Sequence, residues 1–344
     1  MVDPSLSIGR GQRQLIPGDR YTGKTPIIIN IISSNNILNI IGTLDGIGTK
    51  ALISLYLGIN RNSSKLGSII PFIWLVNWYV LILSPHSPSS SLFSYILPLI
   101  GISIAEILRD RGFDIIIRFD DSSKHPKSHR QIGSISGKIP SRDASPSDIL
   151  NIHSSISERA GKSNSCYFNG SITGFPIIET IANDTTEHIA TNIISITDSQ
   201  LYTNKKLFLD SCHPAIDSAL PISRIGSNAQ CKPIKIISVG LKNELTNLRI
   251  NINNNNNSNN NINLSILNIL YCQDYLFIPS INIIIILIFI YRNGIFLNKV
   301  IKLHQLLYLL SIDYFYIYHI ISLLKSNYSI LLYYYIISII LFIA

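Results

Sequence analysis

The chain has 344 residues, which is enough for one large domain or two of moderate size, and 47% of these residues are hydrophobic. Charged residues make up only 14%, with a formal net charge of +8. This charge permits binding to anionic partners such as phosphates, nucleic acid or lipid headgroups. The basic residues are scattered rather than gathered in one stripe, so we expect no nucleic acid as a partner.

Residues 1–250 alternate short apolar runs with polar turns, a rhythm that predicts an α/β domain. The helices that we place between the strands include Pro26–Ile32 and Ile149–Arg159. Side-chain oxygens of Ser147 and Asp148 can cap the second of these helices. We expect strands at Gln14–Ile16, Ala51–Leu57, Tyr79–Leu83, Asp114–Phe119, Gly174–Glu179 and Ile194–Thr197.

A phosphate-binding motif follows the first expected strand. Residues 18–25 fit the pattern G-x-x-x-x-G-K-[ST] without a mismatch, with Gly18, Asp19, Arg20, Tyr21, Thr22, Gly23, Lys24 and Thr25. The glycines let backbone N–H groups converge on phosphate oxygens, and the Lys24 ammonium adds a charge on those oxygens. The Thr25 hydroxyl is suited to ligate Mg²⁺. Pro26 is tolerable because the first helical turn needs no backbone donor. The motif predicts that the chain binds a nucleoside triphosphate with Mg²⁺.

Such a loop needs a distant carboxylate that holds the Mg²⁺ shell, normally after an apolar strand. The segment FDIIIRFDD, residues 113–121, places Asp120 at the end of a strand with Asp121 beside it. We therefore predict Asp120 as a metal residue together with Thr25. On its own, the pair could also be two exposed acids that begin a turn. Arg118 inside this strand is unusual and must find a partner or a sheet edge.

His125 and His129 are four residues apart, so a helix would place both on one face as possible metal ligands. Pro126 lies between them, and no third ligand is evident. We therefore expect a surface or linker role for these histidines rather than a zinc site.

The last third of the chain changes character. Residues 251–263 are almost pure Asn, which predicts a flexible linker or surface insertion. Residues 264–344 are strongly apolar, and their runs Ile281–Tyr291 and Ser329–Ala344 are nearly free of charge. Each run is shorter than the ~20 residues of a membrane-spanning helix, so we favour buried helices or strands over membrane spans.

Six collinear segments resemble the alpha subunits of F-type ATP synthases, in the mitochondrial and bacterial rather than the plastid form. The segments are VDPSLSIGRGQRQLIPGDRYTGKT (2–25), AEILRDRGFDIIIRFDDSSKH (105–125), IPSRDASPSDILNIHSSISERAGK (139–162), GSITGFPIIET (170–180), TNIISITDSQLY (191–202) and PAIDSALPISRIGSNAQ (214–230). Weaker similarity continues in LKNELTNLR (241–249), and beyond the Asn-rich tract in YCQDYLFIP and IYRNG.

The resemblance implies a RecA-like P-loop core followed by a mostly helical C-terminal region. In that family, alpha subunits alternate with beta subunits in a hexamer and bind Mg-ATP without turning it over. The resemblance assigns Arg224, in SRIGS, as the arginine that reaches the catalytic site of the neighbouring beta subunit. Ile59, in LGINR, stands where catalytic paralogues carry Glu and alpha subunits carry Gln, in keeping with a non-catalytic site.

The same resemblance implies ATP and ADP as ligands, and beta subunits and a central stalk as protein partners. It also implies peripheral membrane association through the complex, on the matrix side of the mitochondrial inner membrane. A plastid thylakoid or a bacterial inner membrane is the alternative location.

The sequence also departs from the family pattern. No counterpart of the N-terminal β-barrel domain is present, so we expect a split gene, a partial frame or a barrel encoded elsewhere. Pro126 interrupts an expected helix, and His213 stands where the family has an Arg near the adenine. Two other hypotheses stay open: an independent RecA-like P-loop ATPase, and a membrane-anchored protein with a nucleotide-binding domain.

Overall fold

The computed structural model describes residues 6–32, 52–59, 66–67, 70–71, 79–85, 91–138, 146, 148–180, 184–210, 212–217 and 222–241, with single positions beyond. The chain divides into two compact units, Met1–Ile278 and Pro279–Ala344, and nearly all described residues belong to the first. The Asn-rich tract and the boundaries that we expected at residues 250 and 263 lie outside the described residues, as does nearly all of the expected helical C-terminal region.

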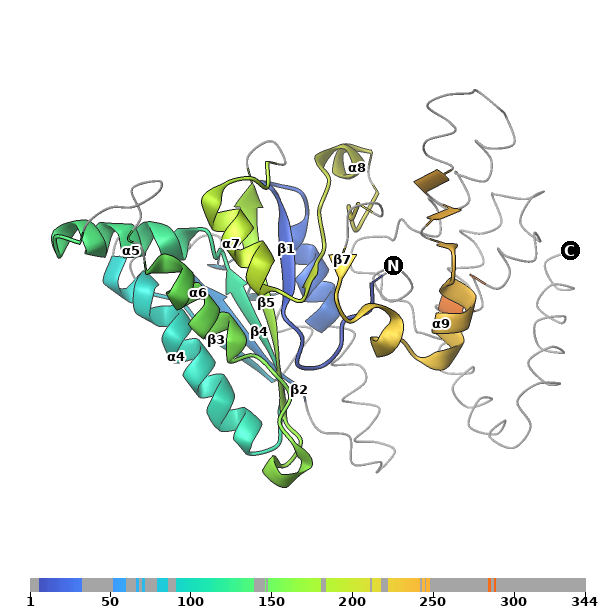
Figure 1. Cartoon of the computed structure of the whole chain (residues 1–344), viewed down its shortest axis with the longest axis horizontal. Helices are drawn as coiled ribbons and strands as arrows, with labels where there is room; N and C mark the ends of the chain where they lie inside the picture. Colours follow the sequence, from blue (N-terminus) through green and yellow to red (C-terminus); the bar gives the residue numbers. More distant parts are fainter. Residues whose placement is uncertain are drawn as a thin grey trace, which may run out of the picture. The chain divides into compact units, whose positions relative to one another are not determined.

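A seven-stranded sheet forms the centre of the first unit, in the order β3-β2-β4-β5-β1-β6-β7 (Figure 1). Its pairs are parallel except that β6 and β7 are antiparallel. The strands are β1 (Gln14–Asp19), β2 (Leu52–Gly58), β3 (Val80–Leu83), β4 (Asp114–Asp120), β5 (Ser171–Thr180), β6 (Ser199–Gln200) and β7 (Ile222–Ser223). Expected strands in the first 180 residues correspond to β1 to β5.

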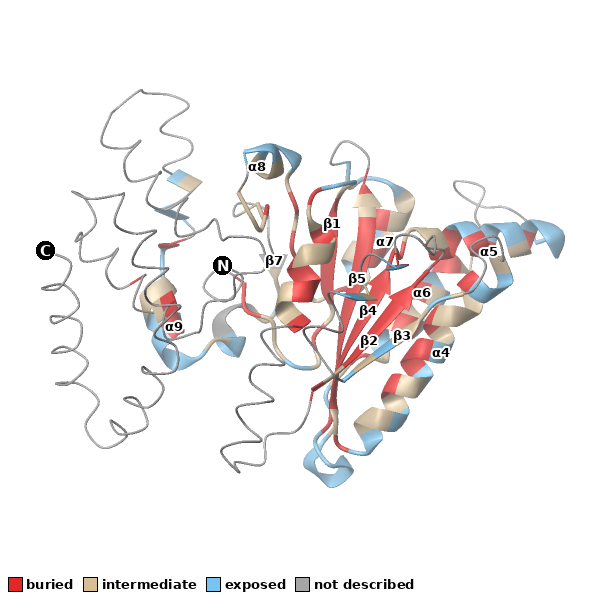
Figure 2. Ribbon diagram, turned by 180° about the vertical axis from the view of Figure 1, so that it is seen from behind, coloured by how far each residue is buried: buried red, intermediate tan, exposed pale blue. Residues whose placement is uncertain are grey.

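Helices cover both faces of this sheet (Figures 1 and 2). Residues 24–32 form the helix that follows β1. The other helices are α4 (Ser91–Asp110), α5 (Lys124–Ile135), α6 (Ile149–Glu158), α7 (His188–Ile196), α8 (Lys205–Leu209) and α9 (Lys232–Ser238), with 3-10 turns at Ser165–Tyr167 and Gly226–Ala229.

Alternation along the strands assigns each buried side chain to one of two cores. On β4, Ile115 and Ile117 pack with Ile102 of α4 and residues of α6. The intervening Ile116 packs with Ile28 of the helix at 24–32, on the other face. Strands β1, β2, β4 and β5 are accordingly the most buried part of the unit, as Figure 2 shows in red, whereas β3 at the edge is partly exposed. This is the α/β architecture of a P-loop nucleotide-binding domain.

The strand that we expected at Ile194–Thr197 is wrong, because these residues form the end of α7. Ala190 and Ile193, three positions apart, are the buried residues of α7, and they pack against β1 and β5. A spacing of three places both on one helical face, and this tertiary packing outweighs the strand preference of isoleucine. The Thr197 hydroxyl then closes the helix by donating to the Ile193 carbonyl at 3.0 Å.

Two expectations about helix beginnings also need correction. Pro126 does not interrupt α5, because it is the third residue of that helix, where no intrahelical N–H donor is required. The carboxylate of Asp148 does not cap α6 but accepts a hydrogen bond from Lys138 Nζ at 2.7 Å. Ser147 lies outside the described residues.

Among the described residues, α4 is the one helix that is long and apolar enough to cross a membrane. Its buried face, which includes Ile102 and Ala105, packs against β2 and β4. The outward face exposes Phe93, Ile100 and Ile107. In this unit α4 therefore serves as a covering layer of the sheet.

Candidate functional site

The P-loop lies at the carboxyl edge of the sheet, between the end of β1 and the helix that begins at residue 24. β1 has β5 on one side and β6 on the other, so the loop lies at a central strand, where open α/β sheets bind their ligands. A Cβ at Gly18 would overlap the Thr203 hydroxyl, so only glycine fits there. Gly23 has φ +77°, a left-handed conformation that glycine adopts without strain.

Hydrogen bonds from three segments fix the loop. The Thr22 hydroxyl donates to the Asp19 carbonyl at 2.8 Å and lies 2.8 Å from the hydroxyl of Thr203, which follows β6. Thr180 of β5 donates to the Asp19 carboxylate at 2.8 Å. The loop is thus anchored on both neighbouring strands before any ligand arrives.

The two large side chains of the loop point outward. The Arg20 guanidinium pairs with Glu179 of β5 at 2.8 Å and is largely exposed. Tyr21 has φ +62° and an exposed fraction of 82%. Neither side chain contributes to the buried part of the loop.

Lys24 is buried, and its ammonium folds back over the loop. Nζ donates to the Gly18 carbonyl and, at 2.9 Å, to the Asp19 carbonyl. Burial lowers the pKa of Lys24, while the nearby carboxylates, Glu179 first among them, act in the opposite direction. An anion in the loop can replace these carbonyls as the partner of a desolvated ammonium, which strengthens the interaction.

An aromatic pair lies beside the loop. The rings of Phe208, on α8, and His213 meet edge to face with centroids 5.1 Å apart. A Cβ built on Gly23 would lie 3.3 Å from the Phe208 ring. His213, at a position that we expected to lie near the adenine, is therefore brought toward the P-loop side of the molecule.

The acidic pair after β4 is buried, so the alternative of two exposed acids in a turn is wrong. Asp120 accepts hydrogen bonds from the Tyr56 hydroxyl at 2.5 Å and pairs with Arg118 at 3.0 Å. Asp121 accepts from the backbone N–H of Ser123 at 3.1 Å. Burial raises the pKa of Asp121, against the effect of those hydrogen bonds.

Arg118 finds its partners inside the protein rather than at a sheet edge. Its side chain is fully buried, with the guanidinium carbon 4.7 Å from the centre of the Tyr56 ring. Its Nη2 pairs with the Asp120 carboxylate at 3.0 Å and donates to the Thr25 hydroxyl at 3.2 Å. Arg118 therefore connects β4 with the first turn of the P-loop helix.

Thr25 and Asp120, which we expected to hold Mg²⁺, do lie close together. The group between them is the guanidinium of Arg118. Oxygens of both residues contact the same nitrogen of Arg118, at 3.2 and 3.0 Å. Mg²⁺ binds oxygen at ~2.0–2.1 Å, so an ion held by both residues would take the position of that nitrogen. With Arg118 between them, Thr25 and Asp120 cannot both ligate Mg²⁺.

Ile59 follows β2 at the same carboxyl edge, and its N–H donates to the Asp120 carbonyl at 2.6 Å. Its apolar side chain is buried. The position beside the acidic pair therefore offers no carboxylate or amide that could orient a water molecule.

Arg224 lies away from the P-loop. It follows β7, and its backbone N–H bonds the carbonyl of Asp198, which precedes β6. The exposed Arg224 side chain donates to the Ser195 carbonyl at 3.2 Å. Because β6 runs parallel to β1, Asp198 marks the amino edge of the sheet, opposite the loop. The structure does not bring Arg224 to the nucleotide loop of its own chain.

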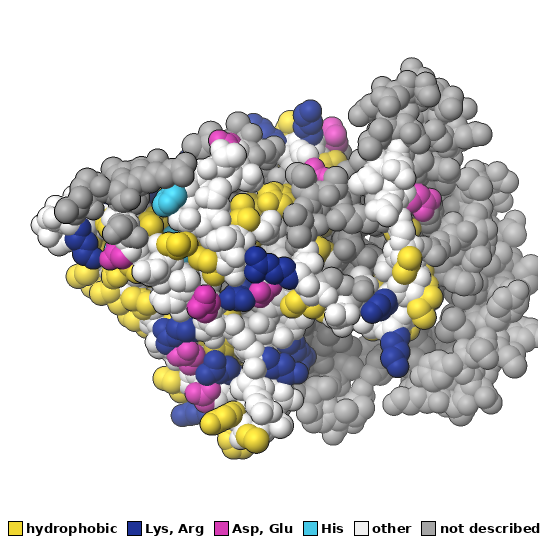
Figure 3. All heavy atoms as spheres, in the orientation of Figure 1, with side chains coloured by type: hydrophobic (Ala, Val, Ile, Leu, Met, Phe, Trp, Pro, Cys, Tyr) yellow, Lys and Arg dark blue, Asp and Glu magenta, His cyan; other side chains and the backbone are white. Residues whose placement is uncertain are grey.

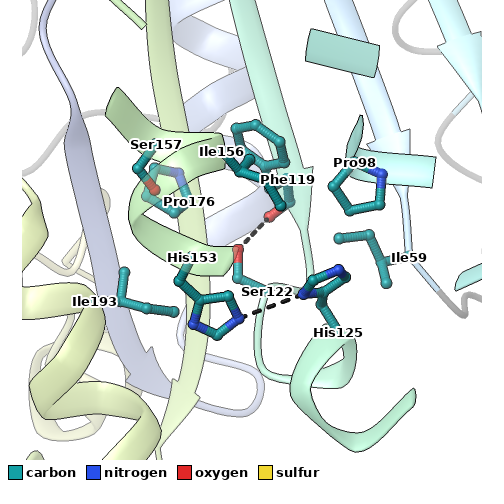
Figure 4. A pocket seen from close by; sticks show the side chains of 10 residues that line it. All are labelled: Ile59, Pro98, Phe119, Ser122, His125, His153, Ile156, Ser157, Pro176 and Ile193. Atoms are coloured by element: carbon teal, nitrogen blue, oxygen red, sulfur yellow. Dashed lines mark hydrogen bonds between the residues drawn. The ribbon is translucent and has the colours of Figure 1, made fainter. Parts of the chain in front are cut away.

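A small pocket lies on the face of the sheet opposite the P-loop helix, and Figure 4 shows the side chains that line it. In it, Nδ1 of His125 lies 3.4 Å from Nε2 of His153. Burial lowers the pKa of His125 to about 4 and that of His153 to about 3. The side chains that line the pocket are Ile59, Pro98, Phe119, Ser122, His125, His153, Ile156, Ser157, Pro176 and Ile193.

The surface or linker role that we expected for His125 and His129 is therefore wrong. Both are buried, and both rings stack on Tyr95 of α4, each with its centroid 5.4 Å from the Tyr95 centroid. Where residues are described, the structure contains no group of three His, Cys, Asp or Glu that could hold a metal. These histidines join α5 to α4 and α6.

Sequence reasoning missed Tyr56, Glu179 and Thr203, the residues that hold Asp120, Arg20 and the loop backbone. Each acts on a partner that is 64 to 181 residues away in the chain. Of the three, Glu179 had a local signal, because it ends an expected strand whose neighbour in the sheet could be the P-loop strand.

Comparison with known proteins accords with this geometry. Residues 1–223 match the ATP synthase alpha/beta family, nucleotide-binding domain. ATP synthase subunit alpha of Acholeplasma laidlawii is 37% identical over 251 residues, which are 72% of this chain and 48% of that protein. The mitochondrial ATP synthase subunit alpha of Dictyostelium citrinum is 37% identical over 252 residues, 72% of this chain and 46% of the relative.

ATP synthase subunit alpha of Mycoplasma mycoides is 38% identical over 247 residues, 71% of this chain and 45% of the relative. The chain thus spans about half the length of these relatives. Bacterial and mitochondrial proteins match to the same degree, so the comparison supports an alpha-type likeness without a mitochondrial type. With a matching family domain over most of its length and a folded P-loop in that domain, the chain belongs to the ATP synthase alpha/beta family.

Proposed function

We propose that this chain provides the nucleotide-binding part of an alpha-type subunit in the F1 sector of a rotary, H⁺-transporting ATP synthase. Its P-loop binds ATP or ADP. The observation that carries the proposal is the folded loop itself, in which buried Lys24 lies over the backbone of Gly18 and Asp19. A desolvated ammonium surrounded by converging backbone groups suits a polyphosphate.

The bound nucleotide is held rather than hydrolysed by this chain. Hydrolysis needs a group that orients the attacking water. Apolar Ile59 stands at the strand end beside the acidic pair, and Asp120 is engaged by Arg118 and Tyr56. These contacts support a non-catalytic, regulatory site.

Catalysis takes place in the adjacent beta subunit, to which this chain supplies Arg224. The exposure of Arg224 at the amino edge of the sheet, away from its own loop, supports a role toward a partner. A guanidinium that reaches a transferring phosphoryl group stabilises the charge spread over its oxygens. The partners in this proposal are beta subunits and a central stalk, with peripheral membrane association through the complex.

The metal expected at Thr25 and Asp120 is left out of this proposal, because both side chains contact Arg118. For the location we propose the matrix side of the mitochondrial inner membrane. A plastid thylakoid or a bacterial inner membrane is the alternative, and both bacterial and mitochondrial proteins are among the relatives.

Purification of the tagged full chain from gently solubilised membranes of its native source tests the proposal. We expect a large complex that contains a beta subunit and a rotor stalk and that hydrolyses ATP. A monomer with its own ATP turnover would instead indicate an independent P-loop ATPase. Retention of the chain in carbonate-washed membranes, without a beta subunit, would indicate a membrane-anchored protein.

A further inference from the structure

We infer that the P-loop site of this chain binds free nucleotide without a divalent cation, because the Arg118 guanidinium occupies the metal position. The inference rests on the proposed nucleotide binding and narrows its ligand to metal-free nucleoside di- or triphosphates. It concerns a residue that belongs to the strand of the acidic pair and not to the P-loop motif.

The geometry is that of a cation between two metal ligands. The Nη2 of Arg118 lies 3.2 Å from the Thr25 hydroxyl oxygen and 3.0 Å from an Asp120 carboxylate oxygen. These are the two oxygens that a P-loop site offers to Mg²⁺ from the loop and from the distal strand. One guanidinium nitrogen bonds both and leaves no room for an ion between them.

Charge and burial keep the guanidinium in place. Arg118 is fully buried, and a guanidinium keeps its charge across the physiological pH range. Mg²⁺ gives up its water reluctantly and would have to displace this cation from its carboxylate. Displacement would leave a buried, unpaired guanidinium, which is strongly destabilising.

Two nitrogens of the Arg118 guanidinium remain available as hydrogen-bond donors to an anion. Among the described residues, Nε and Nη1 of Arg118 have no hydrogen-bond partner although both are buried. Unsatisfied donors of a charged group are costly, and a planar guanidinium matches phosphate oxygens. Together with Lys24, Arg118 gives the loop two fixed positive charges, which compensate a polyphosphate that arrives without its metal.

Equilibrium dialysis of the full chain against radiolabelled ATP tests the inference, in parallel buffers that contain excess Mg²⁺ or excess EDTA. We expect the dissociation constant in EDTA to equal that in Mg²⁺ within about threefold, or to be lower. Binding that is more than about threefold tighter in Mg²⁺ would overturn the inference.

The Arg118→Met variant should acquire metal dependence, because Asp120 and Thr25 then lose their shared cation. We expect its ATP affinity to be at least about tenfold higher in Mg²⁺ than in EDTA. Arg130→Met, at an exposed position of α5, is the matched control and should behave as the wild type. If folded Arg118→Met showed the same ratio of ATP affinities in Mg²⁺ and EDTA as the wild type, Arg118 would not be the residue that excludes the metal.

The Thr25→Ala variant tests the same point if Arg118→Met fails to fold, as circular dichroism would reveal. Without a metal on Thr25, this change should weaken ATP binding equally in both buffers. A selective loss of binding in Mg²⁺ would show that Thr25 holds the metal, and would refute the inference.

The proposed function and this inference fail in different ways. Metal-dependent ATP binding that Lys24→Ala abolishes would remove the inference and leave the nucleotide site intact. If the chain binds no ATP in the Mg²⁺ buffer and none in the EDTA buffer, both the proposed function and the inference are overturned.

Discussion

Arginine on a central, buried strand is rare because its charge must be matched inside the protein. In this chain the match consists of the Asp120 carboxylate, the Tyr56 ring and the Thr25 hydroxyl. The sequence indicated that Arg118 needed a partner but could not identify one. Thr25 lies 93 residues away, and only the folded sheet shows that the β4 side chain reaches the P-loop helix.

The positions of the P-loop residues could be predicted better than the partners of Arg118, because a local motif determines the backbone geometry of the loop. Gly18 and Gly23 are required where the motif places them, by close approach and by a positive φ. Tyr21 departs from this logic, since the residue is left-handed without being glycine. Its side chain is exposed, so no neighbouring residue adds to the cost of this conformation.

Arg224 can be tested by its removal. Arg224→Ala should leave ATP binding by this chain unchanged, because the residue lies at the sheet edge opposite the loop. In the assembled complex, steady-state ATP hydrolysis should fall about a thousandfold, the effect typical of an arginine that acts in trans.

Arg130→Ala, on the exposed side of α5, is the control for that experiment and should retain turnover. Retained turnover in Arg224→Ala would refute the role that we propose for Arg224.

At the scale of elements, the buried strands were predictable because apolar runs bounded by turns have few other interpretations. β4 ends one residue beyond the expected range, whereas β5 begins three residues earlier and ends one residue later than expected. The secondary structure of short segments was harder to predict from the sequence. Ile194–Thr197 reads as a strand in isolation, yet α7 forms because Ala190 and Ile193 pack against β1 and β5. Such tertiary packing leaves little trace in a four-residue window.

The contact between α4, α5 and α6 contains the histidines that the sequence misplaced. Their i, i+4 spacing correctly implies one helical face, but His153 comes from another helix, so the buried cluster could not be inferred. Tyr95 of α4 stacks on both His125 and His129 and thereby connects α5 to α4.

This cluster predicts acid sensitivity. Burial lowers the pKa of His125 to about 4 and of His153 to about 3, whereas both are near ~6.5 in an unfolded chain. The unfolded state therefore binds protons first, and the free energy of unfolding falls as pH drops from about 6.5 toward 4. Between pH 6.5 and 5 the loss should be about 2 kcal/mol for each buried histidine.

Urea denaturation of the full chain at pH 7 and pH 5 measures this effect. His153→Phe should reduce the dependence on pH, while His188→Phe, at a partly exposed position of α7, should not. If the free energy of unfolding depended on pH equally in His153→Phe and the wild type, buried His153 would not be a source of the acid sensitivity.

At the scale of the whole molecule, the face drawn in Figure 3 shows Lys and Arg interspersed with Asp and Glu over the described residues. Ion pairs such as Arg13–Asp198, at 2.7 Å, likewise join opposite charges in the described part of the chain. The net charge of +8 is therefore not concentrated on this face. Family membership rests on residues 1–223, and the apolar region beyond residue 264 contributes nothing to it.

Equilibrium binding of radiolabelled ATP to the full chain measures whether its P-loop holds a nucleotide. We expect saturable binding that Lys24→Ala weakens about tenfold to hundredfold, since a charged hydrogen-bond partner is removed. Lys127→Ala, an exposed lysine on α5, should bind as the wild type does. Equal affinity in Lys24→Ala and the wild type, or no binding by the wild type, would contradict nucleotide binding by the P-loop.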